Sequence, residues 1–300
     1  MAKRKRTTPK VKVIREYGPM IVLVWFGDLV ERMDPGFWNP KWLEYERYKK
    51  YPLRTLGDYQ PFITYGAIVP HQKPLNLRDW RKGVLRVGQK QLTDVVLDLT
   101  EAIVVEEGSR WDVPRARIEY LDLLFPRSGV GSLGKARVAV WLLEDASRKA
   151  VVDCFVDIVR LPKDKIRPEY VAVYIKTRFG RMQINRWLSG VGTINVDFDD
   201  IRNFHLHVIP MPLQNQIAFQ YHSLVRCHDI ATEAKARMLR CKEQGNLQAA
   251  ERPRREYKRN LKAAEAMLAD LVRQVEEVIE GTRTEIEPVT RILETEEVAA

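Results

Sequence analysis

Short apolar runs separated by Gly and Pro dominate the chain from Leu56 to Ile209. Their alternation and their β-branched residues predict strands. The clearest runs are Val84–Val87, Ile103–Val105, Leu121–Phe125, Ala136–Leu143 and Val151–Val159. An earlier apolar run at residues 20–27 predicts a buried strand, and residues 42–51 predict a short helix.

Helical spacing of apolar residues interrupts this pattern before residue 212. From Pro168 to Leu188 this spacing predicts a helix, with Gly180 as a candidate interruption. The segments Val191–Phe198 and Ile201–Val208 then predict strand or extended chain. Together these elements predict an α+β domain dominated by short strands.

The pattern changes after Pro212, where a long helical segment begins. No Pro or Gly occurs from Leu213 to Gln244, and apolar residues recur at steps of three or four. Gly245 and Asn246 predict a helix stop and a turn. Pro253 suits the first turn of a second helix, which Gly281 ends. Two long helices joined by a tight turn predict an antiparallel pair.

Apolar residues of the second helix follow a heptad spacing from Tyr257 to Val278. A lone pair of helices with such a narrow apolar stripe predicts a surface for a partner or a second copy. The side chains expected there are Leu224, Met238, Leu261, Leu268, Leu271, Val275 and Val278. The alternative is that both helices pack on their own domain.

The chain has 300 residues, of which 45% are hydrophobic and 30% are charged. This composition predicts a globular protein with a sizeable core. The pattern divides the chain into a basic flexible arm (1–19), a strand-rich domain (20–212), a helical region (213–281) and an acidic disordered tail (282–300).

Compartment and cofactor content follow from what the sequence contains. The longest apolar run, Met20–Phe26, is far shorter than a membrane helix needs, and no small-residue cleavage site follows it. The three cysteines are too few and too scattered for a disulfide framework or a zinc cluster. We therefore expect a cytoplasmic protein with no signal peptide, no metal and no cofactor.

Positive charge is distributed unevenly along the chain. The net charge is +10, with +7 on residues 1–15, −3 on residues 281–300 and +6 on residues 16–280. A basic arm is typical of proteins that contact phosphates without reading sequence. The alternative is that the arm serves only solubility.

Three motifs that resemble catalytic sites lack the residues that the chemistry needs. Residues 129–135 match the spacing of a nucleotide-binding loop, but Ala136 stands where Ser or Thr binds Mg²⁺, and a strand is predicted to follow. His205 and His207 share one face of a predicted strand, without a third ligand nearby, and we expect a polar outer face. The Glu-x-Lys fragments at 233–235 and 256–258 lie on predicted helices and are expected to be ion pairs. No active site is apparent.

Nucleic-acid binding is better supported, because basic and amide side chains occur at intervals along the strand-rich domain. Arginine clamps phosphate or reads guanine, and amide side chains read adenine. The residues expected to contact DNA are Arg110, Arg127, Lys135, Lys176, Arg178, Arg181, Gln183 and Arg186. The alternative is that they are ordinary surface residues.

The order of several segments resembles the specificity (S) subunits of type I restriction-modification systems. RMDPGFWNPKWLE (32–44) resembles the entry to the target recognition domain of that family, and YPLRTLGDYQPFITYG (51–66) resembles the lead into its first strands. YLDLLFPRSGVGSLGKARV (120–138) resembles its Gly-rich turn. Residues 166–216 resemble its closing helix, a Gly-Thr turn, a last strand and the entry into a long helix.

This resemblance implies a non-catalytic chain made of a DNA target recognition domain and a helical spacer. Its implied partners are double-stranded DNA, methyltransferase (M) subunits on the helices and a restriction (R) subunit, in a system for DNA methylation and phage defence. Typical members carry two recognition domains and two spacers. This chain has room for one of each, which implies a half-subunit that forms a homodimer or pairs with a second half.

The sequence is also compatible with two other functions. One is a non-enzymatic DNA- or protein-binding adaptor that oligomerises through its helices. The other is a nuclease or modification enzyme whose site the sequence does not reveal.

Overall fold

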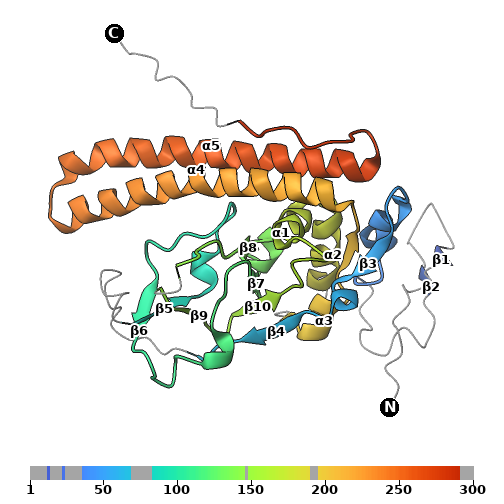
Figure 1. Cartoon of the computed structure of the whole chain (residues 1–300), viewed down its shortest axis with the longest axis horizontal. Helices are drawn as coiled ribbons and strands as arrows, with labels where there is room; N and C mark the ends of the chain where they lie inside the picture. The colour runs from blue at the N-terminus through green and yellow to red at the C-terminus, as the bar shows by residue number, and fades with distance from the viewer. Residues whose placement is uncertain are drawn as a thin grey trace, which may run out of the picture.

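The computed structural model describes residues 12–13, 22–23, 36–68, 83–145, 148–189 and 195–290. A strand-rich part lies beneath a pair of long antiparallel helices (Figure 1). The predicted α+β class with a helical hairpin is therefore confirmed. Most of the basic arm and of the run at 20–27 lies outside the described residues, which include the paired strands β1 (Lys12–Val13) and β2 (Val22–Leu23).

Two small sheets form the strand-rich part. The four-stranded sheet is antiparallel, in the order β4 (Phe62–Tyr65), β10 (Val156–Arg160), β7 (Leu123–Pro126) and β8 (Ala139–Val140). The three-stranded sheet has the order β6 (Ile103–Val105), β5 (Val84–Val87) and β9 (Ala150–Val152), with β5 and β9 parallel. A separate pair joins β3 (Leu53–Thr55) to β11 (His205–His207). The predicted short helix at 42–51 is a 3-10 helix, Pro40–Arg47.

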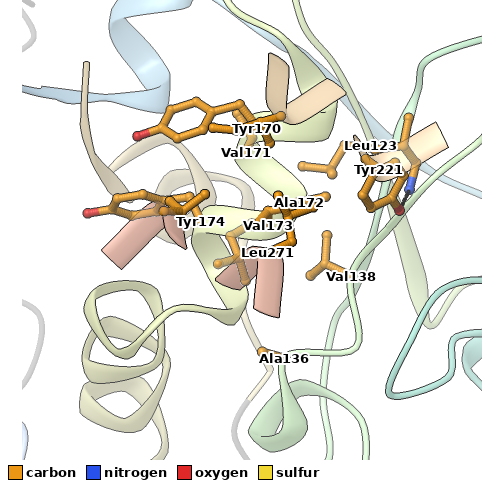
Figure 2. Close-up of a cluster of buried hydrophobic side chains, with 14 of the residues drawn as sticks. Leu123, Ala136, Val138, Tyr170, Val171, Ala172, Val173, Tyr174, Tyr221 and Leu271 are labelled. Atoms are coloured by element: carbon orange, nitrogen blue, oxygen red, sulfur yellow. Dashed lines mark hydrogen bonds between the residues drawn. The ribbon is translucent and has the colours of Figure 1, made fainter. Parts of the chain in front are cut away.

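The helix α1 (Pro168–Lys176) forms the centre of the main hydrophobic core. Pro168 occupies its first turn, and every residue from Pro168 to Ile175 is buried. In Figure 2 the side chains of α1 lie among residues of the β7–β8 region and of both long helices. The hydroxyl group of Tyr221 accepts a hydrogen bond from the Val140 amide at 3.1 Å, which ties β8 to the hairpin.

The helical hairpin consists of α4 (Met211–Glu243) and α5 (Leu247–Glu280). Its residues near α1 belong to the same core cluster as the four-stranded sheet. Leu224, Leu271, Val275 and Val278 are fully buried, Leu268 and Met238 are more than nine-tenths buried, and Leu261 is partly buried. Six of these seven side chains are therefore buried against residues of this chain rather than presented to another protein. Leu261 keeps part of its surface exposed, and its place in an interface stays a prediction.

The segment predicted as one helix from Pro168 to Leu188 is two helices, α1 and α2 (Arg178–Leu188). The chain breaks at Thr177, which is extended, rather than at Gly180. The Thr177 hydroxyl group accepts a hydrogen bond from the Gly180 amide and so caps α2. A Cβ atom at Gly180 would lie 2.5 Å from the Cα of Ile175, so the close approach of the two helices requires glycine.

Two other boundaries differ from the prediction. Residues expected to be extended form the helix α3 (Phe198–Arg202), because Asp197 and Asp200 make a reciprocal capping box. The helix α5 begins at Leu247, capped by Asn246, so Pro253 lies inside the helix and not in its first turn. Gly245 and Gly281 have positive φ angles, as the predicted turn and helix end require.

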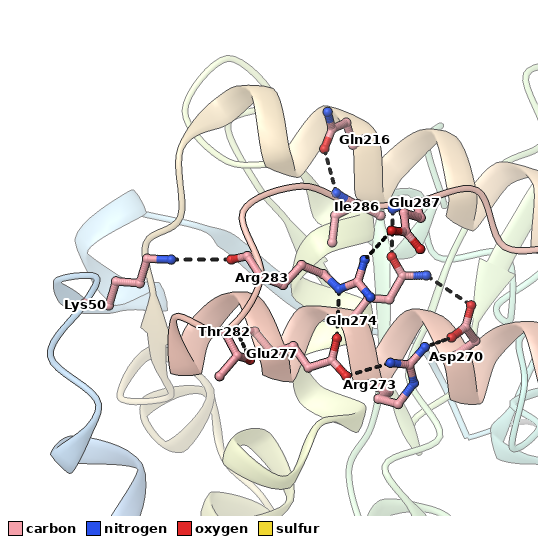
Figure 3. Close-up of polar contacts among 10 residues, drawn as sticks. All are labelled: Lys50, Gln216, Asp270, Arg273, Gln274, Glu277, Thr282, Arg283, Ile286 and Glu287. Atoms are coloured by element: carbon pink, nitrogen blue, oxygen red, sulfur yellow. Dashed lines mark hydrogen bonds and ion pairs between the residues drawn. The ribbon is translucent and has the colours of Figure 1, made fainter.

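Residues 282–290, which we name the strap, run along the hairpin (Figure 3). Their amides are bound by glutamine side chains of the helices: Ile286 donates to Gln216 at 3.0 Å, Glu287 to Gln274 at 2.7 Å and Val289 to Gln220 at 3.0 Å. Ile286 and Val289 are buried. The expectation of disorder from residue 282 onward is therefore wrong for the strap.

The strap is expected to contribute to stability. Truncation after Gly281 removes two buried apolar side chains, each worth about 1.5–3 kcal/mol, and exposes the core beneath them. The entropy cost of ordering the strap offsets part of this gain, so we expect the free energy of unfolding to fall by about 2–4 kcal/mol in urea titrations. Truncation after Thr290 keeps the strap and is the matched control. Equal stability of the two truncated proteins would show that the strap does not stabilise the fold.

Candidate nucleic-acid interface

The Gly-rich turn at residues 129–136 is held by basic side chains from α1 and α2. Lys176 donates a hydrogen bond to the carbonyl group of Ala136 at 3.1 Å. Arg181 donates to the carbonyl groups of Gly134 and Lys135, both at 3.2 Å. These contacts bring Lys135, Lys176 and Arg181, three of the predicted DNA-contacting residues, to one place.

A single carboxylate, Asp94, lies among these cations. Arg137 contacts it at 2.7 Å and Lys135 at 3.8 Å, while Lys176 donates to its backbone carbonyl group at 3.2 Å. We name Asp94, Lys135, Arg137, Lys176 and Arg181 the Asp94 cluster. One acid among four bases leaves it with a net positive charge when all five groups are ionised.

Burial and charge act in opposite directions within the Asp94 cluster. The hydrogen bond from Arg137 is the largest effect on Asp94 and lowers the pKa of its carboxyl group. Desolvation lowers the pKa of Lys176, although the carboxylate of Asp94 opposes this change. Lys135 and Asp94 are exposed, with side-chain exposures of 55% each, so a polyanion can reach the cluster.

Arg127 belongs to a second group, just after the end of β7 and beside the start of β10. Its guanidinium group lies 4.3 Å from the ring centre of Tyr65 and 5.9 Å from that of Phe198, and Arg115 also lies over Tyr65. We name Tyr65, Arg115, Arg127, Asp157 and Phe198 the Tyr65 cluster. Stacking of this kind orients a guanidinium group at little entropic cost.

Asp157 is the buried acid of the Tyr65 cluster. Neither of its carboxylate oxygens accepts a hydrogen bond within the described part of the chain, and the nearest cation, the Nε of Arg127, lies 3.7 Å away. Burial raises the pKa of Asp157 to about 7, although the charge of Arg127 lowers it. Asp157 is therefore partly protonated near neutral pH, and it then offsets less of the charge of Arg127.

The remaining predicted DNA-contacting residues are used differently. Gln183 is buried, and its amide exchanges hydrogen bonds with the backbone of His205 at 2.9 and 2.7 Å, so it cannot read a base in this structure. Arg178 pairs with Glu280 and donates to the Tyr48 hydroxyl group, which links α2 to the hairpin. Arg186 donates to the carbonyl group of Phe37 at 3.1 Å.

Arg110 is exposed, lies over the ring of Trp111 at 4.9 Å and belongs to neither cluster. Sequence reasoning missed Arg137, and it noted Arg115 among the basic residues of the domain without including it in the expected DNA contacts. Arg137 precedes a strand, and Arg115 lies in a short 3-10 helix, so neither stands out by spacing. Each belongs to its cluster through a contact with a residue that lies 43 or more positions away in the sequence.

The motifs that resembled catalytic sites are structural. The amides of Ser132 and Gly134 donate to the carbonyl group of Gly129, so they are not presented to a phosphate. His207 is fully buried between the Tyr174 hydroxyl group and the carbonyl group of Tyr45, and burial lowers its pKa to about 4. The expected polar outer face is therefore wrong for His207. No group of three potential metal ligands occurs within the described ranges.

Comparisons with known proteins give matches only among solved structures. No protein-family model and no curated protein matches the sequence. One similar chain comes from a structure concerning complex assembly and conformational transition of a type I restriction-modification system. It is 12% identical, with a TM-score of 0.40, and the match covers 84% of this chain and 47% of that chain.

Two other similar structures are S subunits. The type I restriction-modification S subunit from M. genitalium is 9% identical, with a TM-score of 0.39 and coverage of 65% of this chain and 43% of that chain. The HsdS subunit from Thermoanaerobacter tengcongensis is 12% identical, with a TM-score of 0.37 and coverage of 80% and 46%. This chain spans about half the length of the solved structures it matches, and the likeness is loose.

A helix that crosses a bilayer must be long and apolar, and none of the helices in the described residues meets that requirement.

Replacement of the one acid in the Asp94 cluster is expected to strengthen binding to duplex DNA. Asp94→Asn keeps a hydrogen-bond acceptor for Arg137 but removes a negative charge among four bases. We expect affinity at low salt to rise roughly two- to tenfold, the size of one charge interaction near water. Asp164→Asn removes an exposed acid outside both clusters and is the control. Equal affinities of the two variants in fluorescence anisotropy titrations would contradict a role for the cluster.

Proposed function

We propose that this chain is a non-catalytic DNA recognition subunit of a type I-like restriction-modification complex. Its strand-rich domain binds double-stranded DNA, and the complex directs a partner methyltransferase, and in a restricting system a nuclease, to the target sequence. The observation that carries the proposal is the Asp94 cluster, which gathers four basic side chains from three segments of the chain at an exposed Gly-rich turn.

The two clusters suit different parts of this task. Lys135 and Arg137 of the Asp94 cluster suit phosphate contacts, which fix the position of a protein on the duplex. Arg127, oriented by Tyr65 and Asp157, suits contact with a base edge. A subunit with one such domain recognises half of a target, and two copies would recognise a symmetric, gapped site.

Most of the predicted apolar stripe is buried within this chain, so a partner protein would bind to another part of the hairpin surface. Phe219 on α4 is 64% exposed and lines a groove of about 510 Å³ together with Leu142, Ala218 and Val225. Exposed aromatic residues beside a groove are typical of protein interfaces. We therefore place the contact with a methyltransferase subunit on this side of α4.

Selection from a random duplex library tests the proposed recognition directly. The full chain, alone and with its methyltransferase, is expected to enrich one short motif. Lys135→Gln/Arg137→Gln is expected to weaken binding and to reduce the slope of log affinity against log salt by about 1.8, the value for two lost phosphate contacts.

Two results would contradict the proposal. The first is a library without any enriched motif although the protein is folded and binds duplex DNA. The second is an unchanged salt slope in the double variant.

A further inference from the structure

The net positive charge of residues 16–280 is concentrated around the turn that joins α4 to α5. Residues 237–262 hold nine Lys and Arg against three Glu, a net charge of +6, and residues 16–280 as a whole also carry +6. The remainder of that central region is therefore neutral. Figure 1 shows that the turn between α4 and α5 projects past the strand-rich domain.

The basic residues of α5 in this segment lie on one face. With about 100° between successive residues of a helix, they fall within an arc of roughly 160°. They are Arg252, Arg254, Arg255, Lys258, Arg259 and Lys262, and all are exposed. The opposite face carries buried Ala250, Asn260 and Ala264, which face into the hairpin. We name these six residues the basic face.

Nearby carboxylates do not neutralise four of the six residues of the basic face. Glu256 pairs with Arg237 of α4 at 2.8 Å, and Glu251 pairs with Arg254 at 3.2 Å. Within the described residues, no carboxylate lies at ion-pair distance from Arg252, Arg255, Lys258 or Arg259. Like charges at spacings of three and four residues destabilise an isolated helix, so an anion bound there would relieve a repulsion.

The composition of the face favours nucleic acid over a protein partner. Four of its six residues are arginine, whose planar group matches phosphate oxygens. The exposed large hydrophobic residues include none between 251 and 262, whereas protein interfaces depend on apolar and aromatic anchors. The four residues without a carboxylate partner span about 10 Å of helix, roughly one charge per 2.6 Å, which approaches the charge density of duplex DNA, about one per 1.7 Å.

We propose that the basic face is a second DNA-binding surface, which contacts the phosphate backbone of double-stranded DNA without reading its sequence. This role goes beyond the proposed function, because it does not require the strand-rich domain to recognise a site. It would add salt-dependent affinity and extend the DNA contact of the protein along the hairpin.

The test measures binding of the full chain to a random-sequence 40-base-pair duplex across a series of salt concentrations. The variant is Arg252→Gln/Arg255→Gln/Lys258→Gln/Arg259→Gln, in which glutamine keeps a high helix propensity. The control, Lys49→Gln/Arg54→Gln/Lys163→Gln/Lys165→Gln, removes the same charge from exposed positions of the strand-rich domain. Circular dichroism confirms that both retain their helix content.

We expect the affinity of the basic-face variant for the duplex to fall at least tenfold. The slope of log affinity against log salt should become shallower by about 2 to 4 in this variant and stay unchanged in the control. An unchanged slope in the variant would overturn the proposal. The proposal would also be overturned if the variant lost binding to polyglutamate but bound the duplex as tightly as before, because the face would then serve an acidic protein. A normal motif from library selection with this variant would leave the recognition role intact, so the two proposals fail separately.

Discussion

Complete burial of α1 is the constraint on which the rest of the structure depends. Its residues from Pro168 to Ile175 fill the space between the sheet and the hairpin, so neither element can move without exposing apolar surface. The next few residues then reach in different directions. Lys176 and Arg181 hold the Gly-rich turn, and Arg178 pairs with Glu280 at the end of α5. A segment of six residues thus sets the proposed DNA-binding surface relative to the hairpin.

This arrangement separates the contributions that a recognition subunit needs. Positioning on DNA depends on charge, and the Asp94 cluster and the basic face supply it from two separate parts of the chain. Discrimination between sequences depends on oriented side chains, and Arg127 is the best-oriented candidate, because Tyr65, Phe198 and Asp157 surround it. The raised pKa of Asp157 makes the net charge of that group sensitive to pH near neutrality.

Elements with a long periodic signal could be predicted from the sequence. The apolar spacing revealed both long helices, and Gly245 and Gly281 marked their ends correctly. The start of α5 was misjudged because Pro253 is a strong local signal, whereas the true cap is Asn246. The helix α3 has five residues, too few to show a period, and its capping box decides its structure. The strap depends on glutamine side chains of the helices, which no local pattern reveals.

The candidate site was predictable in part for the same reason. Lys135, Lys176 and Arg181 do come together, but Gln183 points into the core, because the residues of α2 that face the domain are set by packing. The heptad residues of α5 were assigned to a partner because the spacing is the same whether a helix packs on its own domain or on another chain.

The most direct test of the central claim is a genome-wide map of methylated bases in the source cells, with and without the gene for this chain. Our account predicts that deletion abolishes methylation at one short or gapped motif and leaves other motifs unchanged. A map that stays the same in cells that express the protein would contradict the claim that this chain directs a methyltransferase to its site.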